Sequence, residues 1–180
     1  MNKLWGHFKT ITYHKLKVAE GCFKIGLYRQ GLFHDLSKYS PSEFWVGVKY
    51  FQGNQSPNNA ERKDIGYSSA WLHHKGRNKH HYEYWIDYST RVKPGETIPV
   101  PMPDRYIAEM LMDRIAASKV YEGKNYTDHS PLDYYYKGTH RAIMHEKTRQ
   151  KLLYYLELLA NEGEKETFCK IRQELVRGKH

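Results

Sequence analysis

The chain has 180 residues, of which 39% are hydrophobic and 14% aromatic, a composition that excludes an intrinsically disordered protein. Its length predicts one domain with a sizeable core. The formal net charge of +9 favours anionic partners such as nucleotides, phosphorylated metabolites or nucleic acid, although a solvated basic surface explains it equally well.

The sequence predicts a cytoplasmic protein without membrane association. It contains no run of 18 apolar residues, and its first residues lack the apolar core of a signal peptide. The two cysteines, Cys22 and Cys169, lie far apart in helical patterns, so we expect both to be reduced core residues.

Helical spacing of apolar residues dominates the first third of the chain. Residues 3–16 and 18–32 form either two helices or one bent helix. Glycines within the second pattern weaken it, which is tolerable where helices cross closely. Ser40-Pro41-Ser42-Glu43 has the sequence of a capping box and predicts a new helix that extends to Phe51.

The middle of the chain contains more loop signals. We expect a loop over 52–59, a helix over 60–75 that Gly76 ends, and one or two helical turns over 82–88. Residues 90–103 are rich in proline and predict a surface loop beside the functional site.

The last part of the chain is again helical. The clearest helix covers 103–122, a loop is expected over 123–138, and helices are expected over 140–162 and 165–176. No convincing strand pattern is present. The sequence therefore predicts an all-α single-domain bundle over 1–180 with six to eight helices and at most two short strands. Its core would cover about 5–120, with C-terminal helices over 140–176.

An adjacent histidine and aspartate, His34-Asp35, lie between two predicted helices, where polar groups can project into a cleft. Imidazole and carboxylate together suit a divalent metal of the Zn, Mn or Fe type. Lys38 follows three residues after Asp35 and precedes a helix N-terminus, so we expect it to contact an anionic substrate.

Two histidine doublets, His73-His74 and His80-His81, follow. On one continuous helix, residues seven apart would be about 10 Å apart along the axis. A break at Gly76 would let the chain fold back, so that both doublets face one cleft. The alternative is a set of solvent-exposed histidines among basic neighbours.

Three further residues complete the candidate set. His14 lies on the helix before His34 and is either a ligand from a separate helix or a solvent-facing side chain. Asp113 lies within an apolar helix, so it is paired with Arg114 or a nearby lysine, or bound to metal. Glu109, one turn earlier, is either a base near the site or a solvated charge.

The order His14, His34-Asp35, histidine cluster, Asp113 resembles the HD-domain superfamily of metal-dependent phosphohydrolases. The segment His-Asp-Leu-Ser-Lys matches the His-Asp-hydrophobic-small-Lys form of that superfamily. The segment from His73 to Trp85 is similar to an HD-like branch. The resemblance covers roughly residues 5–120 and implies an all-α HD-type fold, with a second metal in branches that carry additional histidines.

The resemblance implies hydrolysis of a phosphomonoester or phosphodiester such as a nucleotide, with one or two divalent ions of the Mn, Zn, Fe, Mg or Ni class. The expected metal ligands are His14, His34, Asp35 and Asp113, with His73 and His80 beside a second ion. The expected catalytic residues are Asp35, Lys38 and Glu109, and the expected substrate-binding residues are Lys38, Arg77, Asn78 and Lys79. Trp45, Tyr82 and Trp85 either stack on a base or belong to the core.

Two other functions compete with this hypothesis. A non-enzymatic basic nucleic-acid-binding protein would explain the charge and the abundant tyrosine, but it leaves the ordered histidines and aspartates unexplained. A di-iron oxygenase of the HD-like type would use the same ligands with redox-active metal. The sequence leaves the oligomeric state open.

Overall fold

A computed structural model describes residues 2–91 and 95–177 of the chain. The described part is all-α, with eight α-helices and one two-stranded sheet, which confirms the predicted fold class. The α-helices are α1 (Lys3–Lys24), α2 (Tyr28–Phe33), α3 (Pro41–Tyr50), α4 (Pro57–Ile65), α5 (Ser69–Lys75), α6 (Asp104–Glu122), α7 (Ser130–Lys137) and α8 (Glu146–Arg177). Short 3-10 helices are η1 (Leu36–Tyr39), η2 (Tyr82–Trp85), η3 (Gly123–Asn125) and η4 (Thr139–Arg141).

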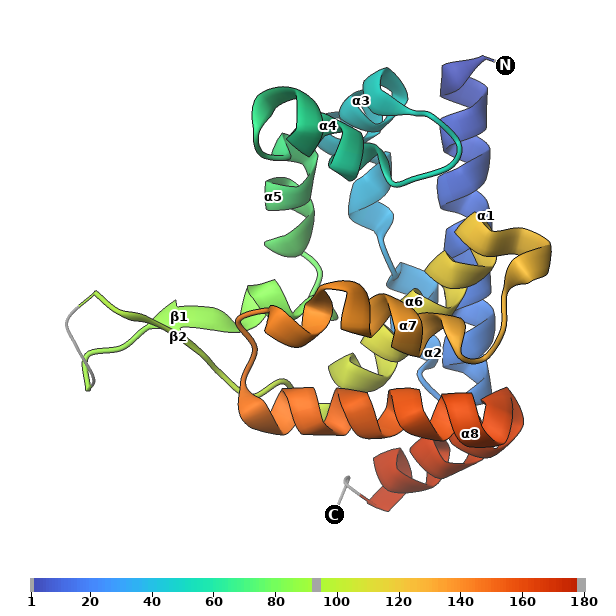
Figure 1. The fold of residues 1–180 in the computed structure, drawn as a ribbon, viewed down its shortest axis with the longest axis vertical. Helices are drawn as coiled ribbons and strands as arrows, with labels where there is room; N and C mark the ends of the chain where they lie inside the picture. Colours follow the sequence, from blue (N-terminus) through green and yellow to red (C-terminus); the bar gives the residue numbers. More distant parts are fainter. Residues whose placement is uncertain (1, 92–94, 178–180) are drawn as a thin grey trace.

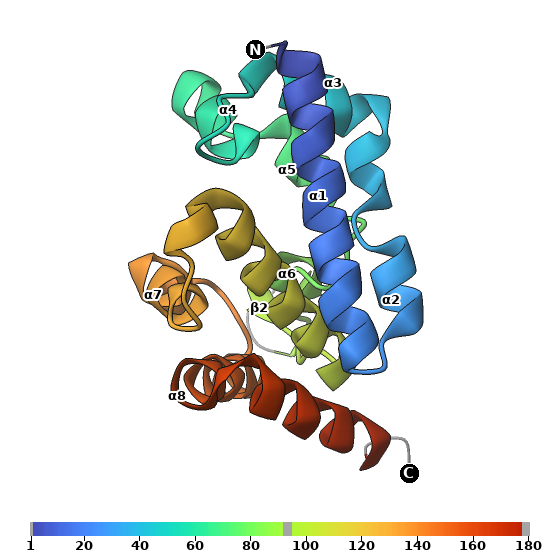
Figure 2. The ribbon, with the colours of Figure 1, turned by 90° about the vertical axis from the view of Figure 1, so that its right-hand side faces the viewer.

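Helix α1 is one long helix, and the chain turns back at its end to place α2 alongside it (Figure 2). The turn passes through Gly26, whose positive φ of 82° suits glycine. Glycine at position 21 is explained by close helix packing, as expected, because a Cβ there would lie 2.7 Å from Met112 Sδ of α6. Helices α1 and α6 therefore cross closely, which brings their polar side chains together.

The hydrophobic core extends through the C-terminal helix. Helix α6 packs against α1, α7 and α8 (Figures 1 and 2). Buried residues of α1, α6 and α8 form one cluster that includes Val18, Leu111, Leu152, Leu156 and Ile171. The sequence therefore builds a single core from both ends of the chain, and α6 runs through it towards the site.

Several predicted boundaries in the middle of the chain are wrong. The helix expected over 60–75 is two helices, because Gly66 ends α4 with a φ of 85°. The loop expected over 52–59 already contains the start of α4, with Pro57 in its first turn.

The C-terminal half also differs from the sequence-based expectation. The predicted loop over 123–138 contains α7, where Pro131 occupies the first turn. The break expected between helices over 140–162 and 165–176 is confirmed within α8 at Gly163, where φ is 79°, but α8 begins at Glu146 and not at residue 140. Cys22 is buried as expected, whereas Cys169 is exposed.

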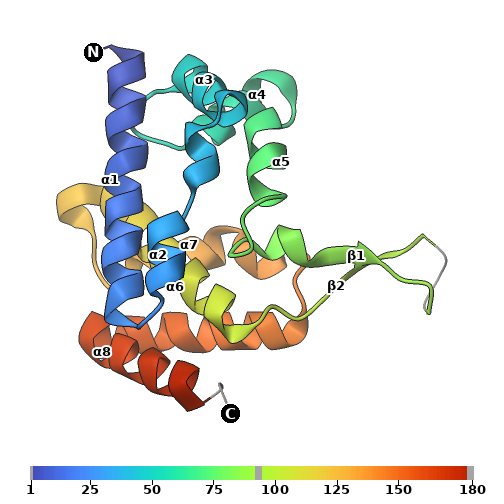
Figure 3. The same cartoon turned by 180° about the vertical axis from the view of Figure 1, so that it is seen from behind.

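The segment expected to be helical over 82–88 is η2 followed by strand β1 (Ile86–Tyr88), which pairs with β2 (Thr97–Pro99) in an antiparallel hairpin. The hairpin projects away from the helices (Figures 1 and 3). Most described residues of 90–103 are irregular, as predicted, but the segment contains β2 and does not lie beside the site; residues 92–94 lie outside the described residues. Within the described ranges, no helix is long and apolar enough to cross a membrane.

The packing of α3 against α1 gives a stability prediction. Gly47 of α3 lies against His7 of α1, and a Cβ at position 47 would overlap the imidazole ring. We expect Gly47→Ala to destabilise the protein by about 1–3 kcal/mol, because the overlap outweighs the usual gain in helix propensity. Urea denaturation measures this change.

Gly76→Ala is the matched control for this prediction. Gly76 has a helical φ of −73°, and a Cβ there would lie 3.4 Å from the nearest atom, an ordinary contact. We expect a change of at most about 0.5 kcal/mol for this variant. Equal stability changes in the two variants would show that the close approach of α1 and α3 does not require glycine at position 47.

Candidate metal centre

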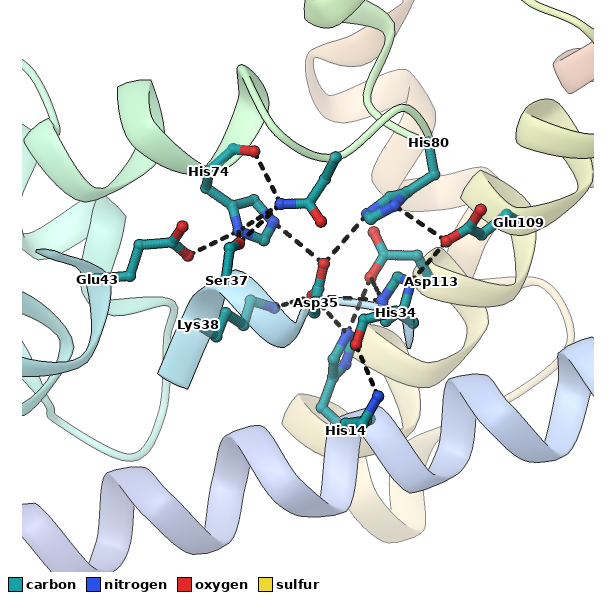
Figure 4. Close-up of polar contacts among 12 residues, drawn as sticks. His14, His34, Asp35, Ser37, Lys38, Glu43, His74, His80, Glu109 and Asp113 are labelled. Carbon is teal, nitrogen blue, oxygen red and sulfur yellow. Dashed lines mark hydrogen bonds and ion pairs between the residues drawn. The ribbon is translucent and has the colours of Figure 1, made fainter. Parts of the chain in front are cut away.

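Imidazoles and carboxylates from four parts of the chain converge around Asp35 (Figure 4). They come from α1, from the turn between α2 and η1, from α5 with the loop after it, and from α6. The converging residues are His14, His34, Asp35, His74, His80, His81, Glu109 and Asp113. The fold therefore assembles one polar cluster inside a helical bundle, beside its hydrophobic core.

The turn that carries His34 and Asp35 has an unusual backbone. Among the described residues, Asp35 is the one non-glycine residue with positive φ, at 54°. Aspartate is among the side chains that tolerate this conformation. The Lys15 ammonium supports the turn by donating to the carbonyls of Leu32 at 2.6 Å and His34 at 2.9 Å. As a result, the Asp35 carboxylate is directed into the protein and is only 1% exposed.

A first set of four residues surrounds one oxygen of Asp35. His14 Nε2 lies 2.9 Å from Asp113 Oδ1 and 3.7 Å from Asp35 Oδ2. His34 Nε2 lies 3.3 Å from Asp35 Oδ2 and 3.5 Å from Asp113 Oδ1. One atom from each residue lies within 4.8 Å of the others. The structure thus brings together the four residues that the sequence analysis grouped, and Asp113 faces these histidines.

A second set surrounds the other oxygen of the same carboxylate. His74 Nε2 lies 3.3 Å from Asp35 Oδ1, and His80 Nε2 lies 3.4 Å from it. His81 completes this set, in which the potential ligand atoms also lie within 4.8 Å of one another. Helix α5 ends at Lys75, and the chain then folds back, which brings the second doublet, His80-His81, close to His74. Asp35 is therefore shared between two groups of imidazoles through two different oxygens.

Two glutamates orient these imidazoles from outside. Glu109 Oε1 lies 3.0 Å from His34 Nδ1 and 3.2 Å from His80 Nδ1. Glu43 Oε2 lies 2.8 Å from His74 Nδ1. When each Nδ1–H donates to a carboxylate, the opposite Nε2 is left with a lone pair directed at Asp35. Carboxylates behind metal-binding histidines fix ring orientation in the same manner.

The capping-box prediction at the start of α3 is wrong for this reason. Ser40 occupies the N-cap, but its side chain makes no capping hydrogen bond. The Glu43 carboxylate faces His73 and His74 and does not return to the helix N-terminus. The helix begins where expected, while its glutamate supports the histidine cluster.

The converging atoms are buried, and most of them make no hydrogen bond. Those without one include Nε2 of His34, His74, His80 and His81 and Oδ1 of Asp35, whereas His14 Nε2 lies 2.9 Å from Asp113 Oδ1 and Asp35 Oδ2 lies 2.6 Å from Lys38 Nζ. Buried polar atoms that lack partners cost free energy, so such a concentration indicates a missing positively charged partner. A donor set of neutral imidazoles and carboxylates fits divalent ions of the Zn, Mn, Fe or Ni type.

The aspartates and His81 have the charges that this donor set requires, whereas two other imidazoles favour a proton. Burial acts to lower the pKa of His34 and His74, but the Asp35 carboxylate outweighs it and raises both pKa values, so a bound metal ion would displace those protons. Burial acts to raise the pKa of Asp35, but His34 and Lys38 outweigh it and hold that pKa well below its usual value. Burial of Asp113 is likewise outweighed by the neighbouring imidazoles of His14 and His34, so its pKa is also well below the usual value. Burial and the neighbouring imidazoles hold the pKa of His81 well below its ordinary value. The aspartates are therefore anionic and His81 is neutral near pH 7, as metal ligation requires.

Two expectations about ligands and bases need correction. His73 was expected beside a second ion, but its Nδ1 lies 2.6 Å from Glu43 Oε1, and His74 takes the place facing Asp35. Glu109 was expected to be a catalytic base or a solvated charge. It is buried and held by two imidazoles, which makes it a positioning residue.

The expected substrate-binding residues divide into two groups. Lys38 lines the cavity over the site, and its Nζ lies 2.6 Å from Asp35 Oδ2. Arg77 and Lys79 are exposed and do not line that cavity. Asn78 donates from Nδ2 to the His74 carbonyl at 2.8 Å and to Ser37 Oγ at 2.9 Å, so it stabilises the fold-back after α5.

A cavity of about 530 Å³ opens onto the cluster. Its floor includes His14, His74, His81 and Asp113. Its walls come from α1, η1, α3, α4, α5, η2, α6, α7 and η4 and from the loop between α3 and α4. Of the aromatic residues considered for base stacking, Tyr82 lines the cavity, whereas Trp45 is exposed and Trp85 packs against the core.

Three contributors to this region were not predicted from the sequence. His81 belongs to a doublet from which only one member was expected near the site. Glu43 was assigned to a helix cap, although its position near the histidines requires tertiary contacts. Arg114 was considered only as a partner for Asp113, but it lines the cavity instead. The sequence of the doublet could have indicated both histidines as candidate ligands. Nothing in the sequence alone places Glu43 or Arg114 at the site.

Residues 3–158 match the family described as DUF5662, a family of unknown function, and the chain therefore belongs to this family. No curated protein and no solved structure matches the chain.

Proposed function

We propose that the protein is a metal-dependent phosphohydrolase of the HD-domain type, with two divalent ions that share Asp35, acting on a phosphomonoester or phosphodiester. The observation that carries the proposal is the arrangement around this one carboxylate. Each of its oxygens faces a separate group of buried imidazoles, most of whose Nε2 atoms make no hydrogen bond. Sharing of one carboxylate by two ions is a geometry that suits phosphoryl chemistry.

The proposed ligands form two sets. The first ion would be held by His14, His34, Asp35 and Asp113, and the second by Asp35, His74, His80 and His81. When bound, the ions supply a hydroxide at neutral pH and neutralise charge that develops on phosphate oxygens.

The remaining residues bind and orient the substrate. Lys38 lies at the edge of the ligand sets and lines the cavity, so its ammonium can contact a phosphate oxygen. Glu109 and Glu43 keep the imidazoles in orientations that expose Nε2. The cavity admits a small organic phosphate above the floor of ligands.

The proposal is tested by metal analysis and phosphate release on protein purified without a chelator or a histidine tag. We expect about two equivalents of a transition metal per chain, and phosphate release from a panel of nucleotides and sugar phosphates. A chelator would abolish this activity, and Mn or Zn would restore it. Protein that binds no metal, or metal-loaded protein that releases no phosphate from any panel member, would exclude the proposed function.

Lys38 gives a separate prediction. We expect Lys38→Met to lower kcat/KM for phosphate release by about 10²–10³-fold, because one charge-assisted contact to the reacting phosphate is lost. Metal content would stay unchanged, as measured by elemental analysis of the same preparations. Lys79→Met is the control, because Lys79 is exposed outside the cavity and lies over the ring of Tyr84. Loss of metal together with loss of the folded structure in Lys38→Met would assign Lys38 a structural role.

A further inference from the structure

We propose that Arg114 binds a second anionic group of the substrate, at a subsite in the cavity wall away from the proposed metal ligands. The inference rests on the proposed function and names the substrate class: organic phosphates with another phosphate or carboxylate group. The subsite is formed by Arg114 with Thr139 and Tyr134 at the α6–α7 side of the cavity.

The guanidinium of Arg114 lacks a counter-ion. Within the described ranges it makes no ion pair, and its one side-chain hydrogen bond is a long one, 3.4 Å from Nη1 to Thr139 Oγ1. Its Nε is buried and has no hydrogen-bond partner. Arg114 is half-buried. Because its buried Nε–H has no acceptor, a guanidinium in this position favours an anionic ligand that can accept from it.

Arg114 is placed to act on the same ligand as the metal site. It follows Asp113 directly on α6, and both side chains line the same cavity. Successive helical residues point about 100° apart. Asp113 is directed at the histidines, so Arg114 points to a different part of the wall, beside Thr139 of η4. A ligand that reaches both places must extend beyond the phosphate held at the metal ligands.

The other cations of the cavity are already engaged. Lys38 Nζ lies 2.6 Å from Asp35 Oδ2. Arg62 donates to Asn59 Oδ1 at 2.9 Å, and its guanidinium lies 5.4 Å from the ring centre of Trp71. Arg114 is thus the cavity cation most in need of a partner. A guanidinium also binds phosphate and carboxylate through two parallel hydrogen bonds, which makes it selective for these groups.

Glu83 limits the charge that the cavity can accept. Its carboxylate lines the same cavity, and its Oε2 is buried without a hydrogen-bond partner. That carboxylate repels each further negative charge in the cavity, so it disfavours a chain of several phosphates more than a single anionic group on Arg114. The substrate class is therefore a phosphate ester with one further anionic group.

The test is calorimetric binding of alkane bisphosphonates, from trimethylene to hexamethylene, to the metal-loaded protein. Each is compared with the alkyl monophosphonate of equal chain length, and neither kind can be hydrolysed. We expect at least one bisphosphonate to bind about tenfold or more tightly than its monophosphonate. In Arg114→Gln we expect this advantage to disappear, while monophosphonate affinity and metal content stay unchanged. Arg114→Lys would keep part of the advantage.

Two further variants make the test specific. Arg77→Gln removes a cation that lies outside the cavity, so it would leave the advantage unchanged. Glu83→Gln removes the opposing charge, so it would leave the advantage intact or increase it. An equal loss in Glu83→Gln and Arg114→Gln would overturn the inference, because it would show that the two side chains act together on an uncharged group or support the fold.

The outcomes separate the two proposals. If monophosphonates fail to bind the metal-loaded protein, the proposed phosphohydrolase function fails. If they bind and no bisphosphonate binds more tightly, the function stands and the Arg114 subsite is refuted. Equal weakening of monophosphonates and bisphosphonates in Arg114→Gln also refutes it.

Discussion

Replacement of Asp35 by asparagine is expected to remove both metal ions and to lower kcat/KM for phosphate release by about 10³-fold or more. Each oxygen of this carboxylate faces one of the two imidazole groups. An amide carries no charge and offers a single oxygen, so it can serve at most one of the two sets, and weakly. Elemental analysis and phosphate release on the same preparation measure the two effects.

Asparagine is the suitable replacement because of the backbone at this position. Asp35 has φ 54° and ψ 25°, a left-handed conformation that asparagine adopts as readily as aspartate. Alanine would add backbone strain, so a loss of metal could then result from disruption of the turn and not from loss of the carboxylate. We therefore expect the circular dichroism spectrum of Asp35→Asn to match that of the wild-type protein.

Thermal unfolding provides an independent measure of the same change. Ligands that bind only the folded state raise its stability, so a chelator is expected to lower the Tm of the wild-type protein. The Tm of Asp35→Asn would not respond to a chelator, since no metal remains to be removed. The control is Asp133→Asn, because Asp133 forms an exposed pair with His129 at 3.4 Å on the surface of α7. Retention of both metals in Asp35→Asn would refute the shared-carboxylate arrangement.

The arrangement of His14, Asp35 and Asp113 was predictable because the relevant signals lie in the chain order. Helical spacing identified α1 and α6, and an aspartate inside the apolar pattern of α6 required a partner. Close crossing of these helices then brings His14 to 2.9 Å from Asp113. Apolar periodicity alone did not give the buried face of α1, because Leu4 and Leu16 are exposed while His14 is buried. The ligands were grouped by their order in the chain, through the resemblance to the HD-domain superfamily.

The supporting residues were not predictable, because they depend on how helices are rotated against each other. Glu43 has the spacing of a capping residue, yet its carboxylate contacts the nearby imidazoles and does not cap the helix. Arg77 and Lys79 are basic and close in sequence to the site, but the fold-back after α5 leaves both exposed. Local sequence shows that these side chains are charged. It does not show in which direction the turn presents them.

The choice between His73 and His74 shows the same limit at the scale of one residue. Adjacent positions on a helix point about 100° apart, so only one of them can face Asp35. His74 shares a buried face with Ala70, four residues earlier, at 2% and 3% exposure. His73 follows the exposed face of Ser69. The spacing of Ala70 and His74, four residues apart, was the one sequence feature that favoured His74 over His73. Two residues are too short a pattern to decide between the two histidines.

This difference leads to a paired prediction for two adjacent histidines. His74→Gln is expected to remove about one equivalent of metal per chain and to lower kcat/KM for phosphate release by about 10²-fold or more, because His74 Nε2 faces Asp35 Oδ1 at 3.3 Å. His73→Gln is expected to keep both equivalents and most of the activity. Elemental analysis, phosphate release and thermal unfolding on both variants test the prediction.

Each variant controls for the other, because the substitution is the same and both imidazoles contact Glu43, at 2.6 Å for His73 and 2.8 Å for His74. A loss caused only by disturbing Glu43 would therefore be seen in both proteins. Metal loss in His73→Gln with retention in His74→Gln would reverse the assignment of the second ligand set. Retention of both ions in both variants would show that His74 is not a ligand of the second ion. A loss confined to His74→Gln is the result that the geometry around Asp35 Oδ1 requires, since His80 and His81 alone leave that oxygen with an incomplete set of imidazoles.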